Sequence, residues 1–178
     1  MEIKSDGTNR AHARSLSSYA SPYILEVKAK KSENIEVFVH WDGQLYGTYD
    51  VPNNAYHVPL YDSWSSPTRF ILQKRVNGVA TNLVTYDINL DTGWHIYKII
   101  VKTDGIEVYY DGTLILSTTD TTFTSGYLGL SGRETPAAIN SFYDNVFTRK
   151  YCSPEPTWGT WGSEESAGFP HSTGFTIG

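Results

Sequence analysis

Short segments in which apolar and polar residues alternate follow one another along the chain. The segment IEVFVHW, residues 35–41, is a clear case. Its alternation separates two sets of side chains: Ile35, Val37, Val39 and Trp41 on one face, and Glu36, Phe38 and His40 on the other. Successive side chains of a β-strand point to opposite faces of a sheet, so a period of two residues predicts a strand.

The segment YKIIVKTDGIEVYYDGTLILS, residues 97–117, predicts three strands in succession. The first two meet across Asp104-Gly105, and the third returns across Asp111-Gly112. Asp-Gly suits the positive φ angles of a tight hairpin turn because glycine has no Cβ to clash. This segment therefore predicts an antiparallel meander.

Glycine-containing turn pairs recur elsewhere, and further strands are expected near residues 2–5, 9–16, 22–31, 45–51, 55–62, 68–76, 82–88, 126–131 and 141–150. No stretch shows helical periodicity. So many strands exceed one open sheet and predict an all-β fold, a two-sheet antiparallel sandwich. We expect Trp94 and Tyr97 in its core, and Phe142 and Val146 pointing inward from the last strand. Several strands are apolar on both sides, which predicts either a concave outer groove or strands lying under loops.

Composition and charge exclude some functions. Of the 178 residues, 39% are hydrophobic and 14% aromatic, which favours half-buried strands. The net charge is −5 and no basic cluster occurs, so we expect no nucleic-acid partner. Cys152 is the single cysteine, so no disulfide can form within the chain.

The ends of the chain bear on its location. The opening residues MEIKSDGTNR lack the apolar stretch of a signal peptide, and no window is long and apolar enough to span a membrane, so we expect no membrane insertion. A cytoplasmic protein and an extracellular module cut from a longer precursor both fit these observations.

Two longer stretches resemble a known family. GWHIYKIIVKTDGIEVYYDGTLILSTTDTTFTSGYLGLSG (93–132) and SFYDNVFTRKY (141–151) are similar to the laminin-G-like branch of concanavalin A-like jelly rolls. The resemblance covers roughly residues 1–165, and the ending RKYCSPEPTWGTWGSEE looks like the close of such domains in archaeal and bacterial surface proteins. It implies a jelly-roll domain over residues 1–152, followed by a closing segment and linker or tail over 153–178. This architecture hosts lectins, glucanases, carbohydrate-binding modules and adhesion domains, so it does not decide function.

Catalytic motifs are absent from the sequence. Glucanases of this superfamily carry Glu-x-Asp-x-x-Glu, and no glutamate here is followed two residues later by aspartate. Glu36 and Asp42 share strand parity but lie about 20 Å apart along an extended chain, too far for joint catalysis. No serine elbow and no metal-binding His motif occurs. We therefore predict a protein that is not an enzyme.

Resemblance suggests one metal. Related jelly rolls often hold a structural calcium ion near an aspartate of the last strand, and Asp144 in FYDNV corresponds to it. The alternative is that Asp144 only accepts a hydrogen bond from a neighbouring backbone group.

The remaining candidate function is recognition of a ligand by aromatic side chains. Residues 40–69 combine aromatic rings with polar side chains, as sugar-binding sites do. The candidate carbohydrate-binding residues are Trp41, Tyr46, Tyr56, His57, Tyr61, Trp64 and Arg69. An alternative is that half of these rings belong to the core. We predict an extracellular or cell-surface module, part of a larger secreted protein, that binds a polysaccharide or glycan. The alternative is a structural spacer or filament subunit that contacts neighbouring modules or copies of itself.

Overall fold

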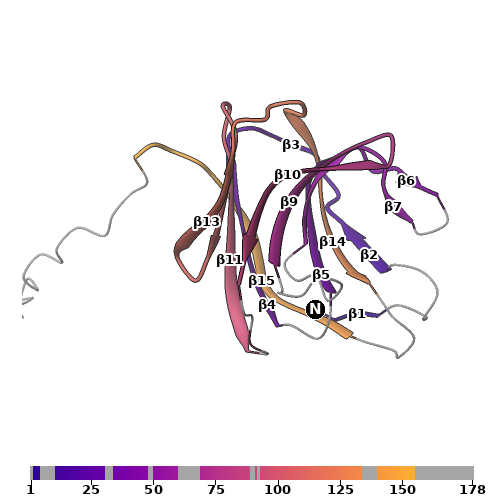
Figure 1. Cartoon of the computed structure of the whole chain (residues 1–178), viewed down its shortest axis with the longest axis horizontal. Helices are drawn as coiled ribbons and strands as arrows, with labels where there is room; N and C mark the ends of the chain where they lie inside the picture. Colours follow the sequence, from indigo (N-terminus) through magenta and orange to yellow (C-terminus); the bar gives the residue numbers. More distant parts are fainter. Residues whose placement is uncertain are drawn as a thin grey trace, which may run out of the picture.

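Two antiparallel sheets stacked face to face form the protein (Figure 1). The computed structural model describes residues 2–4, 11–30, 34–47, 50–59, 69–88, 91, 93–133 and 140–154. None of these residues is helical, and the described part of the chain accordingly has no helix that could cross a membrane. The predicted all-β sandwich is confirmed.

One sheet has six strands and the other seven. The six-stranded sheet runs β1 (Glu2–Lys4), β15 (Asn140–Lys150), β4 (Tyr23–Lys30), β11 (Trp94–Val101), β12 (Ile106–Tyr110), β13 (Thr113–Thr118). The seven-stranded sheet runs β10 (Val79–Asp87), β9 (Arg69–Val76), β8 (Ala55–Pro59), β5 (Asn34–Trp41), β14 (Ser125–Arg133), β2 (Ala11–Arg14), with β3 (Tyr19–Ala20) also paired to β14. The strand expected at 45–51 is instead a small hairpin of β6 (Leu45–Tyr46) and β7 (Val51–Pro52).

The core lies between the two sheets and is built from alternate residues of each strand. In β4, Leu25, Val27 and Ala29 are buried in it, and in β5, Ile35 and Val37 face them. Tyr97 of β11 is buried as predicted. The central meander is confirmed, with β11, β12 and β13 paired in succession.

A bulge in β5 reverses the side-chain alternation before the strand ends. His40 has a φ of 53°, and the pairing with β14 shifts by one residue between Tyr127 and Gly129. A bulge adds one residue to a strand and so exchanges the faces of the residues beyond it. Trp41 therefore joins Phe38 on the outer face, contrary to the predicted grouping.

The same bulge turns the His40 ring toward the end of the core. The ring lies between Tyr23 and Tyr56, at 5.5 and 6.2 Å between ring centroids, and its Nδ1 is 2.8 Å from the Phe123 carbonyl oxygen. Burial lowers the pKa of His40. This histidine is a buried, neutral packing residue.

Gly129 of β14 lies beneath the two outer-face rings. A Cβ at this position would lie 2.9 Å from Phe38 Cδ2 and 2.9 Å from Trp41 Cε3. Only glycine leaves room for both rings to pack against the strand at this position.

Three residues predicted to point inward lie elsewhere: Trp94 and Val146 face solvent, and the half-buried Phe142 pairs with the outer-face residue Lys30. Trp94 is 44% exposed and has Lys28 Nζ 5.5 Å from its ring centroid. It pairs with Lys30 of β4, which alternates with core residue Ala29, so both lie on the outer face. Val146 is 43% exposed because β15 has a bulge between Asp144 and Phe147.

A buried tyrosine links the seven-stranded sheet to the loop before β14. The Tyr56 hydroxyl donates to Asp120 at 2.6 Å, and Lys74 Nζ donates to the other carboxylate oxygen at 2.6 Å. Burial raises the pKa of Asp120, but these hydrogen bonds lower it more, so the group stays ionised in acid.

A histidine clamp fixes the start of β11. His95 Nε2 lies 2.8 Å from Asp91 Oδ1, and its Nδ1 lies 2.7 Å from Asp111 Oδ2. Its ring stacks on Tyr110 with 4.7 Å between centroids. Burial lowers the pKa of His95, but the hydrogen bonds to Asp111 and Asp91 outweigh burial and raise it above 6.5.

Candidate functional site

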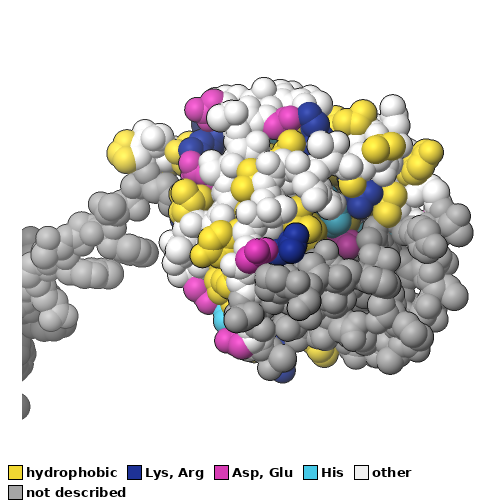
Figure 2. All heavy atoms as spheres, in the orientation of Figure 1, with side chains coloured by type: hydrophobic (Ala, Val, Ile, Leu, Met, Phe, Trp, Pro, Cys, Tyr) yellow, Lys and Arg dark blue, Asp and Glu magenta, His cyan; other side chains and the backbone are white. Residues whose placement is uncertain are grey.

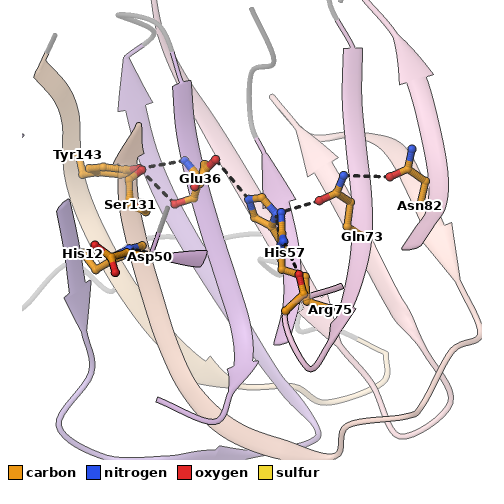
Figure 3. A network of polar contacts seen from close by, with 10 residues as sticks. His12, Glu36, Asp50, His57, Gln73, Arg75, Asn82, Ser131 and Tyr143 are labelled. Atoms are coloured by element: carbon orange, nitrogen blue, oxygen red, sulfur yellow. Dashed lines mark hydrogen bonds and ion pairs between the residues drawn. The ribbon is translucent and has the colours of Figure 1, made fainter. Parts of the chain in front are cut away.

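A row of polar side chains crosses the outer face of the seven-stranded sheet (Figure 3). This polar row consists of Glu36 on β5, His57 on β8, Gln73 on β9 and Asn82 on β10. The four residues occupy adjacent strands, and their positions alternate with core residues such as Val37, Tyr56 and Leu72. Strand pairing therefore brings them together on the side away from the core.

One ion-pair contact and two hydrogen bonds connect the row from its buried end to its exposed end. Glu36 Oε1 lies 3.6 Å from His57 Nε2, and His57 Nδ1 lies 3.0 Å from Gln73 Oε1. Gln73 Nε2 then donates to Asn82 Oδ1 at 2.9 Å. Glu36 and His57 are buried, Gln73 is half-buried and Asn82 is exposed, so the row reaches solvent on β9 and β10.

Arg75 lies beside the row, one step further along β9. Its Nε donates toward His57 Nδ1 at 3.4 Å, and its Nη1 donates to the Gly78 carbonyl oxygen at 3.1 Å. The guanidinium is half-buried, and it places a fixed positive charge next to the exposed end of the row.

The hairpin of β6 and β7 packs across the other end of this face. Trp41 Nε1 donates to the Gln44 carbonyl oxygen at 2.8 Å, and His12 Nε2 lies 2.8 Å from the Asp50 carbonyl oxygen. The Asp42 carboxylate accepts from the side-chain amides of Asn53 and Asn54 at 3.1 and 2.8 Å. These contacts explain why Trp41 and Phe38, although on the outer face, are buried.

One aromatic ring of the hairpin remains open to solvent. Tyr46 is 53% exposed, and its ring lies against the β9–β10 turn, where a Cβ on Gly78 would come 2.1 Å from Tyr46 Cδ1. Gly78 has a φ of 77°, as a tight hairpin turn requires. This contact places an exposed ring at the turn next to Arg75.

The structure corrects several predicted site residues. Trp41, Tyr56 and His57 are 3%, 1% and 2% exposed, so none of them presents a ring for stacking. The bulge and the hairpin bury Trp41, Tyr56 points into the core, and His57 is covered within the polar row.

The remaining predicted residues have different positions. Tyr46 is exposed as such a site requires, and Arg69 lies at the far end of β9, where its Nε is 3.4 Å from Asp87 Oδ1. Tyr61 and Trp64 lie outside the residues that the structure describes. Their roles stay predictions.

The polar row was not predicted, because the predicted carbohydrate site was based on aromatic rings. The signal was present in the segment RFILQKR, where Arg69 and Gln73 lie next to the core residues Phe70 and Leu72, and Arg75 follows Gln73 at the next position of the same parity. Polar residues at such positions mark an outer face that carries hydrogen-bonding groups.

Two further sequence predictions concern chemistry. The polar row contains a single carboxylate, that of Glu36, whereas a retaining glycosidase needs two about 5 Å apart. Asp144 is exposed, and its Oδ1 accepts from the Asn145 backbone at 2.9 Å. Among the described residues, no group of three or more His, Cys, Asp or Glu side chains is placed to hold a metal ion. The calcium site stays a prediction.

Charge is distributed without a basic face on the side shown in Figure 2. The described Lys and Arg side chains there stand among acidic and uncharged ones. This mixed surface differs from the clustered lysines and arginines that track a phosphate backbone.

The sandwich is that of the concanavalin A-like jelly rolls. The sequence matches no protein-family model and no curated protein. Among solved structures, the carbohydrate binding module CBM66 from Bacillus subtilis is similar at 20% identity and a TM-score of 0.65, over 84% of this chain and 86% of that one.

Two other solved structures show how broad this fold class is. A beta-glucanase from Bacillus licheniformis is similar at 18% identity and a TM-score of 0.58, over 79% of this chain and 71% of that one. Sheep galectin-11, in complex with glycerol, is similar at 12% identity and a TM-score of 0.54, over 79% of this chain and 98% of that one. The likeness establishes the fold, and the laminin-G-like branch stays a prediction.

Proposed function

We propose that this chain is a non-catalytic glycan-binding module whose site is the exposed end of the polar row. The observation that carries the proposal is the series of polar contacts that runs from Glu36 through His57 and Gln73 to Asn82. Sugars are recognised by polar groups whose orientation is fixed before binding, because little entropy is then lost.

Contacts within the row hold its two amide side chains. His57 Nδ1 lies 3.0 Å from the Gln73 side-chain oxygen, and the Gln73 nitrogen donates to the Asn82 oxygen at 2.9 Å. These contacts hold the side-chain amides of Gln73 and Asn82 in place at the exposed end of the row. Asn82 and Gln73 would bond sugar hydroxyls, and Tyr46 would stack on the apolar face of a ring.

The absence of an acid pair from the polar row favours binding over hydrolysis. Two of the structural neighbours are, by name, a carbohydrate binding module and a galectin, which supports a glycan as the ligand class. A beta-glucanase with the same fold means that hydrolysis has to be tested. We place the module at the cell surface within a larger secreted protein, where several copies raise a weak affinity.

Glycan-array screening followed by calorimetry with the best glycan tests the proposal. Replacing Asn82 and Gln73 by alanine is expected to weaken binding at least about tenfold, since each lost hydrogen bond to a sugar is worth about 1 kcal/mol. The matched control is Thr81→Ala, because Thr81 neighbours Asn82 on β10 but pairs with Lys74 and points to the opposite face.

Two results would contradict the proposal. Binding that survives both alanine substitutions would remove the polar row as the site. Release of reducing sugar from the bound glycan by the purified chain would show that the protein is an enzyme.

A further inference from the structure

β15, the last strand along the described chain, is unpaired along part of one edge within the described residues. Among the described residues, β1 pairs with β15 at Asn140, Ser141 and Phe142, where the short strand lies beside the start of β15 (Figure 1). From Tyr143 to Lys150, β15 pairs with β4 on one side, and no strand of the described chain pairs with its other side. Backbone groups along such an edge are available to another strand.

The bulge in β15 aligns three side chains on the outer face of this edge. Asp144, Phe147 and Arg149 pair with Lys28, Glu26 and Ile24, which are every second residue of β4. Residues two apart in a strand share a face, so the three β15 residues do so as well, although three positions separate Asp144 from Phe147. All three are exposed, and Phe147 is 45% accessible.

We propose that two copies of the chain pair through this edge of β15, antiparallel, around a two-fold axis at Phe147. Positions along the edge can be counted by the paired residues of β4. On that count, Asp144 lies two positions before Phe147, and Arg149 lies two positions after it. A two-fold axis at Phe147 therefore sets Asp144 opposite Arg149 of the second copy, and Arg149 opposite its Asp144. Phe147 meets its own equivalent, and cross-strand aromatic and opposite-charge pairs both stabilise antiparallel strands.

This arrangement uses the described part of β15 that lies beyond its pairing with β1. Counted by partners on β4, three steps on either side of Phe147 reach Tyr143 and Lys150, the last residue of β15. β1 occupies the neighbouring positions of the edge and is left in place. The β15 strand of the second copy lies in line with β1 of the first copy, along the same edge of β15.

An apolar cavity opens between the two sheets along the same edge. Its volume is about 460 Å³, and Leu25, Leu128 and Leu130 line it, with Val146 and Phe147 at its border. A second copy on β15 would cover part of this opening and remove exposed apolar surface from water. Burial there adds to the backbone pairing.

Charges and bulges on an edge strand can also serve to keep it unpaired. The two explanations predict different responses to reversed charges. An edge that is only solvated is insensitive to the sign of each charge, whereas the paired edge needs opposite signs at Asp144 and Arg149.

The test is sedimentation velocity of the whole chain from about 1 µM to about 1 mM with reductant present, because Cys152 is exposed. We expect the mass to rise toward twice 19.9 kDa. Asp144→Arg or Arg149→Asp alone is expected to weaken dimerisation about tenfold or more, since each places like charges opposite one another twice.

Combining the two changes provides the decisive control. Dimerisation returns in the double variant, because position 144 and position 149 again carry opposite charges. It also returns when the two single variants are mixed, because one variant carries arginine at both positions and the other carries aspartate at both. Asp104→Arg, an exposed charge on the β11–β12 turn, leaves the dimer unchanged. A chain that stays monomeric at all concentrations, or single variants that dimerise like the parent, would overturn the proposal. Both results leave glycan binding by the polar row untouched, since that site lies on the other sheet.

Discussion

Tyr143 crosses the core from one sheet to the backbone of the other, which makes it a sharp test of how the sandwich is held. It belongs to β15, yet its hydroxyl donates to the Ser131 carbonyl oxygen at 2.6 Å and accepts from the Glu36 backbone N–H at 3.2 Å. The side chain is 1% exposed, and burial raises the pKa of Tyr143 well above its ordinary value. The hydroxyl therefore keeps its proton at neutral pH.

Replacing Tyr143 with phenylalanine removes the hydroxyl and leaves the ring in place. A typical hydrogen bond contributes about 1 kcal/mol, and a buried backbone group left without its partner costs about 1–3 kcal/mol. We therefore expect the free energy of unfolding to fall by about 2 kcal/mol. For a chain of this size the melting temperature would fall by about 4–8 °C.

Urea unfolding followed by circular dichroism measures the change. The midpoint should fall while the denaturant slope stays constant, because the surface exposed on unfolding is the same. Tyr86→Phe is the control, since Tyr86 is 44% exposed and its change should stay within about 0.5 kcal/mol. A Tyr143→Phe midpoint equal to that of the parent would show that the hydroxyl bonds do not hold the sheets together.

Three further changes test other parts of the structure. Gly129→Ala is expected to destabilise the fold by about 1–3 kcal/mol in urea unfolding, because its Cβ would lie 2.9 Å from two aromatic rings; an unchanged midpoint would contradict that packing. Because the pKa of His95 is raised above 6.5, its clamp stabilises the fold fully below about pH 6.5, and this contribution is lost as the pH rises through the folded value. Thermal melting from pH 5 to 9 should show this loss in the parent and not in His95→Gln, and identical profiles would refute the clamp. Asp120→Asn should cost about 2 kcal/mol at pH 7 by weakening the charged bonds to its lysine and tyrosine, and the difference from the parent should shrink below about pH 4, since the pKa of Asp120 is lowered.

The strands and the central meander could be predicted because local signals set them. Alternation specifies which segments are strands, and turn pairs such as Asn77-Gly78 and Asp111-Gly112 have the positive φ values that a two-residue hairpin needs. These signals act over a few residues, so a single sequence is enough to recognise them.

Bulges explain where the face assignments were wrong. Alternation predicts the face of a residue only while the strand stays regular, and a single extra residue reverses every position beyond it. Beyond the β5 bulge, Trp41 moved to the outer face, and at the β15 bulge Val146 became exposed. Nothing local in the sequence marks His40 as the residue that adopts a positive φ.

The position of Trp94 depended on a different kind of information. Its strand is apolar on both sides, with Ile96 45% exposed on the outer face and Tyr97 buried in the core. Hydrophobicity alone does not tell which side of such a strand faces the other sheet. Pairing with Lys30 of β4 decides it, and this pairing joins distant segments.

The candidate site depends on the same long-range pairing, which is why aromatic content was a poor guide to it. On the outer face of the seven-stranded sheet, Trp41 and Phe38 pack under the β6–β7 hairpin, and His57 contacts the side chain of Gln73. A side chain that is fixed and covered in this way positions a ligand group but does not touch the ligand. The groups left at the surface are the amide of Asn82, the half-buried Gln73 and the ring of Tyr46. Recognition by this face should therefore depend first on hydrogen bonds to hydroxyl groups and only second on stacking, so that loss of Asn82 and Gln73 weakens glycan binding more than loss of Tyr46.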